Sequence, residues 1–173
     1  PTMVRAAAKN YNHVTVISSI QQYEELIKQL KTNNGSTTLD FRKKMSQNAF
    51  SETAYYDSLI ANYFNKLSNE YFPKKKVFQS KLIEKLRYGE NPHQLSAIYS
   101  IKDSLNLNQL NGKQLSYNNF ADIYAALTIS KSLPEKKGVV IVKHANPCGV
   151  SIIKDKIKCY QSALACDPTS AFG

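Results

Sequence analysis

The sequence lacks long apolar runs and paired cysteines, and it is poor in acidic residues. No run approaches the roughly 18 apolar residues of a membrane-spanning helix, and no basic and then apolar secretory signal opens the chain. We therefore expect no membrane association. The three cysteines, Cys148, Cys159 and Cys166, are odd in number and have no C-x-x-C spacing. That pattern favours free thiols in a reducing compartment and hence a cytoplasmic protein.

The scarcity of acidic residues leaves the chain strongly basic. Asp and Glu number 13 against 23 Lys and Arg, a formal net charge of +10 at pH 7. Such a charge raises the local concentration of anionic partners, either nucleic acid or a phosphorylated metabolite. The lysines are spread along the chain, with one cluster at 74–76, and no RNA-binding aromatic signature accompanies them. We expect a phosphorylated metabolite and no nucleic acid; a basic module that binds RNA or another polyanion is the alternative.

The composition predicts a folded chain. Hydrophobic residues make up 42% and charged residues 21% of the 173 residues, which fits one domain or two small ones. Residue 1 is Pro rather than an initiator Met, and residues 169–173 stop without a terminal helix. We expect a fragment that contains parts of two domains.

The order of the expected elements is α/β. It comprises a short helix at 5–10, a buried strand at 14–17, helices at about 20–32 and 38–67, a linker at 68–80, a strand at 95–101, a helix at 120–132, a strand at 139–142 and a helix at 152–165. Arg5 and Lys9 lie four residues apart, so both cations are expected on one helix face. The fully apolar run at 139–142 is typical of a central strand covered on both faces.

Aromatic and aliphatic residues at helical spacing predict the core of the 38–67 helix. The candidate core positions are Leu39, Phe50, Ala54, Leu59, Ile60, Tyr63 and Phe64. Tyr55, Tyr56, Tyr63 and Phe64 are interpreted as core residues rather than as a stack for a ligand.

The segment from Lys143 to Gly149 carries the strongest chemical pattern. It follows a buried strand, and ligands in open α/β sheets bind beyond the carboxyl ends of strands. Successive strand residues point to opposite faces, so Lys143 and His144 serve one site only if the strand ends there and the chain turns. Pro147 and Gly149 are the residues that we expect to make that turn.

The Lys143–His144 pair has the chemistry of a proton acceptor beside a fixed cation. Imidazole accepts a proton near physiological pH, and an adjacent ammonium stabilises a tetrahedral oxyanion. The alternative is that His144 is a capping or core residue and Lys143 a solvated strand end; spacing alone leaves both open. A deaminase-type zinc site needs His-x-Glu and Pro-Cys-x-x-Cys. Asn146 and Ser151 stand where those motifs need Glu and Cys, so we expect no zinc.

The stretch 87–94 is a second candidate site. It mixes an arginine, a tyrosine and a histidine within a loop constrained by Gly89 and Pro92. Arg is suited to bidentate phosphate binding. An ordinary polar loop is the alternative.

Five ordered motifs together resemble one family. They are Arg-Ala-Ala-Ala-Lys-Asn at 5–10, Leu-Arg-Tyr-Gly-Glu-Asn-Pro-His-Gln at 86–94, Leu-Ser-Tyr-Asn-Asn at 115–119, Val-Lys-His-Ala-Asn-Pro-Cys-Gly at 142–149 and Asp-Pro-Thr-Ser-Ala-Phe-Gly at 167–173. The chain resembles the bifunctional purine biosynthesis family, in which a phosphoribosylaminoimidazolecarboxamide formyltransferase is joined to an IMP cyclohydrolase. The resemblance implies that 1–80 is the C-terminal part of a methylglyoxal-synthase-like cyclohydrolase domain. It implies that 81–173 begins a zinc-free, cytidine-deaminase-like formyltransferase domain.

The resemblance also implies the reactions and the residues that perform them. A formyl group passes from 10-formyltetrahydrofolate to the 5-amino group of the nucleotide AICAR, and the product FAICAR then closes to IMP with loss of water. His144 is implied as the proton acceptor, Lys143 as the stabiliser of the tetrahedral transition state, and Lys9 as the residue that assists ring closure. The implied nucleotide-binding residues are Arg87, Tyr88 and Gly173, with Asn119 as a further candidate.

The resemblance carries further expectations about ligands and assembly. It implies a homodimer with shared formyltransferase sites, and a monovalent cation is a further candidate ligand. The cyclohydrolase phosphate loop is expected before residue 1 and most of the folate site after residue 173, so the isolated chain is expected to be inactive. A parent protein that has lost catalysis is the alternative, against which the intact motifs argue.

Overall fold

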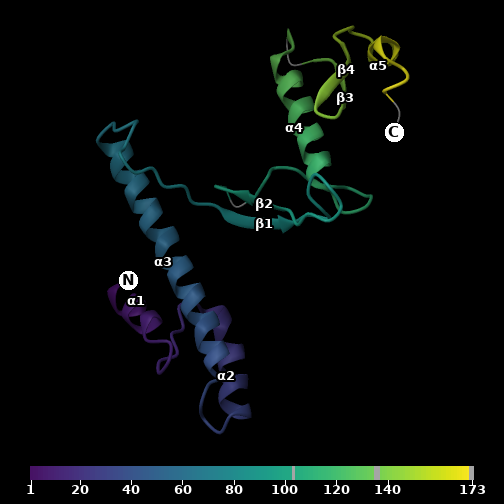
Figure 1. Ribbon diagram of the computed structural model, residues 1–173. Helices are drawn as coiled ribbons and strands as arrows, with labels where there is room; N and C mark the ends of the chain where they lie inside the picture. Colours follow the sequence, from purple (N-terminus) through teal and green to yellow (C-terminus); the bar gives the residue numbers. More distant parts are fainter. Residues whose placement is uncertain (103, 135–136, 172–173) are drawn as a thin grey trace. The chain divides into compact units, whose positions relative to one another are not determined.

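The computed structural model describes residues 1–102, 104–134 and 137–171. The chain divides into two compact units, Pro1–Ser80 (unit 1) and Lys81–Gly173 (unit 2). Figure 1 shows the elements of both units, each of which is described here by itself. None of the helices in the described ranges combines the length and apolar character that a membrane crossing requires.

Unit 1 is helical. Its elements are α1 (Thr2–Lys9), the 3-10 turn η1 (Ile20–Gln22), α2 (Tyr23–Thr32) and α3 (Leu39–Leu67). Thr38 caps α3, because its hydroxyl oxygen accepts a hydrogen bond from the Phe41 N–H at 3.3 Å. Gly35 ends the α2 region with a left-handed φ of +83°, a conformation that glycine adopts at little cost. The expected helices at 20–32 and 38–67 are confirmed.

The predicted strand at 14–17 is wrong. All residues of unit 1 are described, and none of them lies in a strand. A strand needs a neighbour for its backbone hydrogen bonds, and unit 1 offers none. Val16 is instead buried among helices, and the Thr15 hydroxyl is 2.7 Å from the Thr37 hydroxyl.

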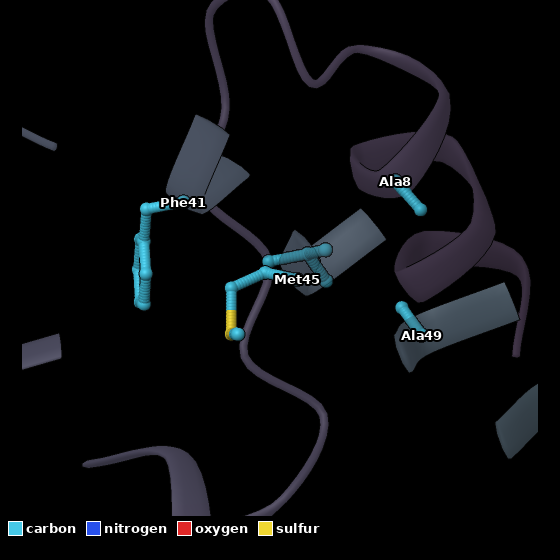
Figure 2. Packing of buried hydrophobic residues seen from close by; sticks show 5 residues of the cluster. Ala8, Phe41, Met45 and Ala49 are labelled. Atoms are coloured by element: carbon cyan, nitrogen blue, oxygen red, sulfur yellow. The ribbon is translucent and has the colours of Figure 1, made fainter. Parts of the chain in front are cut away.

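The core of unit 1 lies between α1 and α3. Figure 2 shows Ala8 of α1 beside the buried side chains of Phe41, Met45 and Ala49 on α3. These α3 residues recur every four positions, which places them on one helix face. Ser46 adds a buried hydrogen bond from its hydroxyl to the Ala8 carbonyl at 2.7 Å. Full burial of Met45 contributes about 1.5–3 kcal/mol.

Most of the predicted core positions of α3 are wrong. Phe50 packs partly against the core. The exposed positions are Leu39, Ala54, Tyr56, Leu59, Ile60, Tyr63 and Phe64, whereas Tyr55 is half-buried. The prediction assumed one apolar stripe along the whole helix, but α1 packs on the stripe that begins at Phe41.

Unit 2 is a mixed α/β unit with two small sheets. Its elements are β1 (Lys81–Lys85), β2 (Ala97–Ser100), α4 (Tyr117–Ser132), β3 (Val139–Lys143), β4 (Asn146–Ser151) and α5 (Lys156–Cys166). β1 pairs with β2 and β3 pairs with β4, both antiparallel. Helices α4 and α5 pack against the β3–β4 hairpin, as Figure 1 shows. The mixed α/β class expected from the sequence is confirmed.

Two expectations for this hairpin region need correction. The strand at 139–142 was expected in the centre of a sheet, but β3 has β4 as its strand neighbour in the part of the chain that the structure describes. All residues of β3 are half-buried rather than covered on both faces. The helix predicted from 152 begins at Lys156, because the Asp155 carboxylate caps it by accepting from the Lys158 N–H at 2.9 Å.

Candidate functional site

The hairpin of β3 and β4 positions the Lys143–His144 pair. Lys143 is the last residue of β3 and pairs with Asn146, the first residue of β4. His144 and Ala145 form the connection, and both have positive φ angles, +52° and +59°. Positive φ at both central residues is the signature of a type I′ hairpin turn. The strand therefore ends at Lys143 and the chain turns there, as one shared site requires.

The residues that make this turn differ from the expected ones. Pro147 and Gly149 were predicted as turn residues, but both lie within β4. The ladder pairs Ile141 with Gly149 and Val142 with Pro147, so Cys148 is an extra residue in β4. A bulge of this kind accommodates proline in a strand.

The conformation of the turn has an intrinsic free-energy cost. A non-glycine residue in the left-handed region costs on the order of 1–3 kcal/mol. Two neighbouring contacts oppose this cost. The Ala145 N–H donates to the Asp122 carboxylate of α4 at 2.8 Å, and the Asn146 side-chain amide donates to the His144 carbonyl at 2.9 Å.

Lys143 and His144 have different surroundings. His144 is exposed at the turn. Lys143 is half-buried and lines a hollow of about 370 Å³ together with Asp122, Tyr160 and Ser170. The hollow is large enough for part of a small ligand and carries a cation, a carboxylate and two hydroxyl groups. This combination is suited to binding and polarising a polar substrate group.

Asp167 adds a second carboxylate to the surroundings of Lys143. The pKa of Asp167 lies below its usual value, mainly because the Ser170 hydroxyl and backbone N–H donate to its carboxylate. The positive charge of Lys143 lowers the pKa of Asp167 further. Among the described residues, no group of three or more His, Cys, Asp or Glu side chains is placed to hold a metal ion.

Arg87 and Tyr88 form a second polar cluster in unit 2. The Arg87 guanidinium donates to the Tyr88 hydroxyl at 3.1 Å and lies 4.8 Å from the centre of its ring. A hydrogen bond from the Ser116 side chain lowers the pKa of Tyr88 most, and the hydrogen bond and charge of Arg87 lower it further. The backbone carbonyl of Tyr88 accepts from the Tyr117 N–H at 3.1 Å. These contacts attach the Arg87–Tyr88 loop to the start of α4.

Asn119 has a structural role in the described contacts. Its side-chain oxygen accepts from the Ser116 N–H at 2.9 Å and from the Ser116 hydroxyl at 3.0 Å. This is the reciprocal half of a capping box at the N-terminus of α4. Any contact between Asn119 and a nucleotide would be additional to this role.

Helix α4 links the two polar clusters. Its first turn contacts Tyr88 through Ser116 and Tyr117, and Asp122, one turn further along, contacts Ala145. Residues three apart on a helix lie on neighbouring positions of one face, so Asn119 and Asp122 face the same side. The nucleotide-binding candidates and the proton-acceptor candidate are thus attached to one rigid element.

Lys9 lies in unit 1 and belongs to a separate candidate site. It is the exposed last residue of α1. Its expected companion Arg5 is half-buried, 3.4 Å from the Thr53 hydroxyl and 5.5 Å from the Phe50 ring centre. The two cations therefore have different surroundings. Gly173 lies outside the described residues.

Sequence reasoning missed Asp122, Asp167 and Ser170. The pattern around Asp122 is that of an ordinary helix, and its contact with Ala145 spans 23 residues. The three-residue spacing of Asn119 and Asp122 was the available signal, but the spacing alone does not indicate that Asp122 contacts the hairpin. Asp167 and Ser170 were visible only as the start of a constrained loop.

Comparison with known proteins identifies the class as a two-activity enzyme family. A sequence model of the AICARFT/IMPCHase bienzyme family matches residues 7–173. This chain belongs to that family.

Three relatives of this chain carry the same name. Bifunctional purine biosynthesis protein PurH of Bradyrhizobium diazoefficiens is 45% identical over 179 residues, a match that covers 100% of this chain and 34% of that protein. PurH of Rhizobium rhizogenes is also 45% identical, with 33% of its length covered. PurH of Neisseria gonorrhoeae is 44% identical over 187 residues, with 35% of its length covered. The chain spans about a third of the length of these relatives.

Proposed function

We propose that this chain is part of a bifunctional enzyme of purine biosynthesis. The enzyme transfers a formyl group from 10-formyltetrahydrofolate to the 5-amino group of AICAR and closes the product, FAICAR, to IMP. The hairpin turn that presents His144 beside Lys143 carries this proposal, because it joins a proton acceptor and a cation at one end of one strand. Membership of the AICARFT/IMPCHase family supports it.

In this proposal the two units serve different reactions. Unit 2 is the beginning of a cytidine-deaminase-like formyltransferase domain that works without zinc. Unit 1 is the end of a methylglyoxal-synthase-like cyclohydrolase domain. The separation of Lys9 and His144 into different compact units supports a division of labour between them.

Formyl transfer uses His144 as the base and Lys143 as the electrostatic stabiliser. The nitrogen of the 5-amino group attacks the formyl carbon, and the imidazole takes a proton from that nitrogen. The ammonium of Lys143 stabilises the oxyanion of the tetrahedral intermediate. The bond between the formyl carbon and N10 of the folate then breaks, and N10 takes up the proton held by His144 as tetrahydrofolate leaves. The half-buried position of Lys143 supports this role, because a partly desolvated charge interacts more strongly than a fully solvated one.

Nucleotide binding falls to the Arg87–Tyr88 cluster. Arg87 is exposed and offers guanidinium donors for a phosphate, while Tyr88 has an aromatic face and a hydroxyl for the base or sugar. Asn119 and Gly173 are further candidates. The net charge of +10 supports attraction of an anionic nucleotide.

Ring closure in this proposal depends on Lys9. The reaction is attack of the carboxamide nitrogen on the formyl carbon within one molecule, with loss of water. Proximity supplies much of the acceleration in such a step. Lys9 polarises the formyl oxygen or carries a proton, and its exposure at the end of α1 leaves the ammonium accessible.

The test separates the two reactions in a protein of the relatives' full length that carries this sequence. His144→Ala should lower kcat for formyl transfer by roughly 10²–10⁴-fold and Lys143→Ala by roughly 10²–10³-fold, while cyclisation of supplied FAICAR is unchanged. Lys9→Ala should impair cyclisation alone. The matched controls His13→Ala, Lys154→Ala and Lys31→Ala, all at exposed positions, should leave both reactions intact. Normal formyl transfer by His144→Ala would refute the assignment of the base.

A further inference from the structure

The turn at His144 and Ala145 needs support from its surroundings. Both residues adopt left-handed φ angles, a conformation that hairpins normally assign to Asn and Gly. Strain of this kind persists where neighbouring contacts hold it in place. The contacts on this turn therefore bear on the position of the His144 imidazole.

The turn is held by contacts of two kinds. The Lys143–Asn146 pair and the hydrogen bond from the Asn146 amide to the His144 carbonyl lie within the hairpin itself. The hydrogen bond from the Ala145 N–H to the Asp122 carboxylate comes from α4 and measures 2.8 Å. Contacts within the hairpin shape the turn, whereas the contact with Asp122 also fixes its position relative to the rest of unit 2.

We propose that Asp122 is a positioning residue for formyl transfer: its carboxylate anchors the His144–Ala145 turn to α4. This proposal rests on the proposed function of His144. Asp122 acts through the backbone of Ala145 and not on the reacting atoms.

The position of Asp122 on α4 connects the anchored turn to the Arg87–Tyr88 loop. The first turn of the same helix is bound to the Arg87–Tyr88 loop through Ser116 and Tyr117. The distance between the nucleotide-binding loop and the base is therefore set through one helix. Catalytic groups need placement to within about 0.5 Å, which second contacts of this kind supply.

The charge of Asp122 gives the anchor its strength. A hydrogen bond from a backbone N–H to an ionised carboxylate is roughly twice as strong as one between neutral groups. Asp122 also lines the hollow that Lys143 lines, so the same side chain contributes negative charge beside the proposed stabilising cation. A neutral residue at 122 that retains an acceptor oxygen should preserve the anchoring but remove the negative charge beside Lys143.

Two substitutions in the full-length protein test the proposal. Asp122→Ala removes the acceptor and should lower kcat for formyl transfer about tenfold to a hundredfold, with little change in KM for AICAR, because misplacing a base slows chemistry more than binding. Asp122→Asn keeps an acceptor oxygen and should lose no more than about fivefold. Cyclisation of FAICAR should be unchanged in both variants.

Asp155→Ala is the matched control for a purely structural loss. Asp155 also accepts one backbone N–H, from Lys158 at 2.9 Å, but it caps α5. Its removal should lower the melting temperature and leave kcat per folded molecule intact. If Asp122→Ala behaves in the same way, or keeps kcat within about twofold of wild type, the positioning role is overturned.

Hydrogen exchange at the turn tests the anchor independently of the reaction. The Ala145 amide should exchange about tenfold faster or more in Asp122→Ala than in wild type or Asp122→Asn, since the hydrogen bond that protects it is lost. Equal exchange in all three proteins would overturn the anchoring. Absence of formyl transfer in the wild-type protein would instead refute the proposed function, so the two failures are distinguishable.

Discussion

Lys143 lies near two carboxylate side chains of unit 2. It shares a hollow with Asp122, and its positive charge lowers the pKa of Asp167. Attraction to nearby carboxylates favours a restricted set of positions for the ammonium. In the proposed reaction, that restriction keeps the cation where the oxyanion forms.

Asp167→Asn should change how stability depends on pH. Because the folded pKa of Asp167 lies below its usual value, the ionised carboxylate stabilises the fold. This contribution is present above the unfolded pKa of about 3.9 and is lost as the pH falls through the lower folded pKa. Denaturant titrations should therefore show that the variant has a lower free energy of unfolding than wild type at neutral pH, and that the difference narrows in acid.

The exposed acidic residue Glu90 of the same unit provides the control for that titration. Glu90→Gln should give a smaller difference from wild type at neutral pH, since Asp167 accepts from Ser170 and is close to Lys143. A difference between Asp167→Asn and wild type that stays constant across the acid range would contradict the prediction.

At the residue scale, the sequence indicated candidate groups for the chemistry, whose roles stay predictions, but it did not indicate their backbone conformation. Lys143 and His144 were identified because a lysine and a histidine follow an apolar strand. The left-handed backbone of His144 and Ala145 was not predictable, because only a few per cent of non-glycine residues adopt that conformation. It is supported by the adjacent ladder of the hairpin and by Asp122, which lies 23 positions before Ala145 in the sequence.

The contact between β4 and α5 depends on the missing side chain of Gly149. A Cβ atom at that position would lie 1.8 Å from the Ala163 carbonyl oxygen. Strand and helix can therefore pack backbone to backbone, with Ala163 fully buried. The packing sets the position of Tyr160, which lies on α5 and lines the same hollow as Lys143.

Gly149→Ala should push α5 away from β4. We expect a destabilisation of about 1–3 kcal/mol, as for other overpacked interiors, together with lower formyl transfer in the full-length protein. Thermal or denaturant unfolding measures the first effect and a formyl-transfer assay the second. Val150→Ala, at the adjacent exposed position of β4, should cost less. Unchanged stability of Gly149→Ala would show that the close approach is relieved by a small shift of the helix.

At the element scale, periodicity predicted the long helices and failed at the hairpin. The apolar spacing in 38–67 and 120–132 was sufficient for α3 and α4, because helix period is a local property. Pro147 and Gly149 indicated a break by the same local rules, yet the extra residue Cys148 accommodates Pro147 in β4. The prediction of a strand at 14–17 was wrong because this apolar run has no partner strand and is buried by helices instead.

On the scale of the whole molecule, residues 68–80 form the last part of unit 1 and lead into unit 2. They form no helix or strand, and Tyr71, Phe72 and Phe78 are exposed there. The end of this stretch is nevertheless tied back to α3, because the Asn62 side chain donates to the Val77 carbonyl at 3.3 Å and to Gln79 at 2.7 Å. The middle of the stretch, which includes the lysines at 74–76, is the most accessible part.

Limited trypsin digestion should cut first at Lys74, Lys75 or Lys76. These residues are exposed in an irregular segment, which is where proteases attack folded proteins. Mass spectrometry should find two resistant products that correspond to the two compact units. Replacement of the three lysines by Gln is the control and should slow this cut selectively. A first cut within α3 or α4 would contradict the expected accessibility.

At the same scale, the sequence indicated the linker but not which apolar surfaces of α3 are exposed. The run of Pro73 and three lysines predicted a linker at 68–80, and the structure has irregular backbone there before the division at Ser80 and Lys81. The assignment of the units to two enzymatic domains stays a prediction. The exposed apolar side chains of α3 were not predicted, since periodicity shows which residues share a face and not whether that face is covered.

The left-handed turn also restricts how residue 145 can vary over evolution. Ala145 is exposed, and exposed positions normally tolerate most amino acids. Here the backbone excludes Val, Ile and Thr, whose branched side chains are severe outliers at positive φ, and leaves Gly, Asn and Asp as acceptable replacements. We therefore expect the backbone geometry of the turn to limit which residues can occupy this exposed position beside the proposed base.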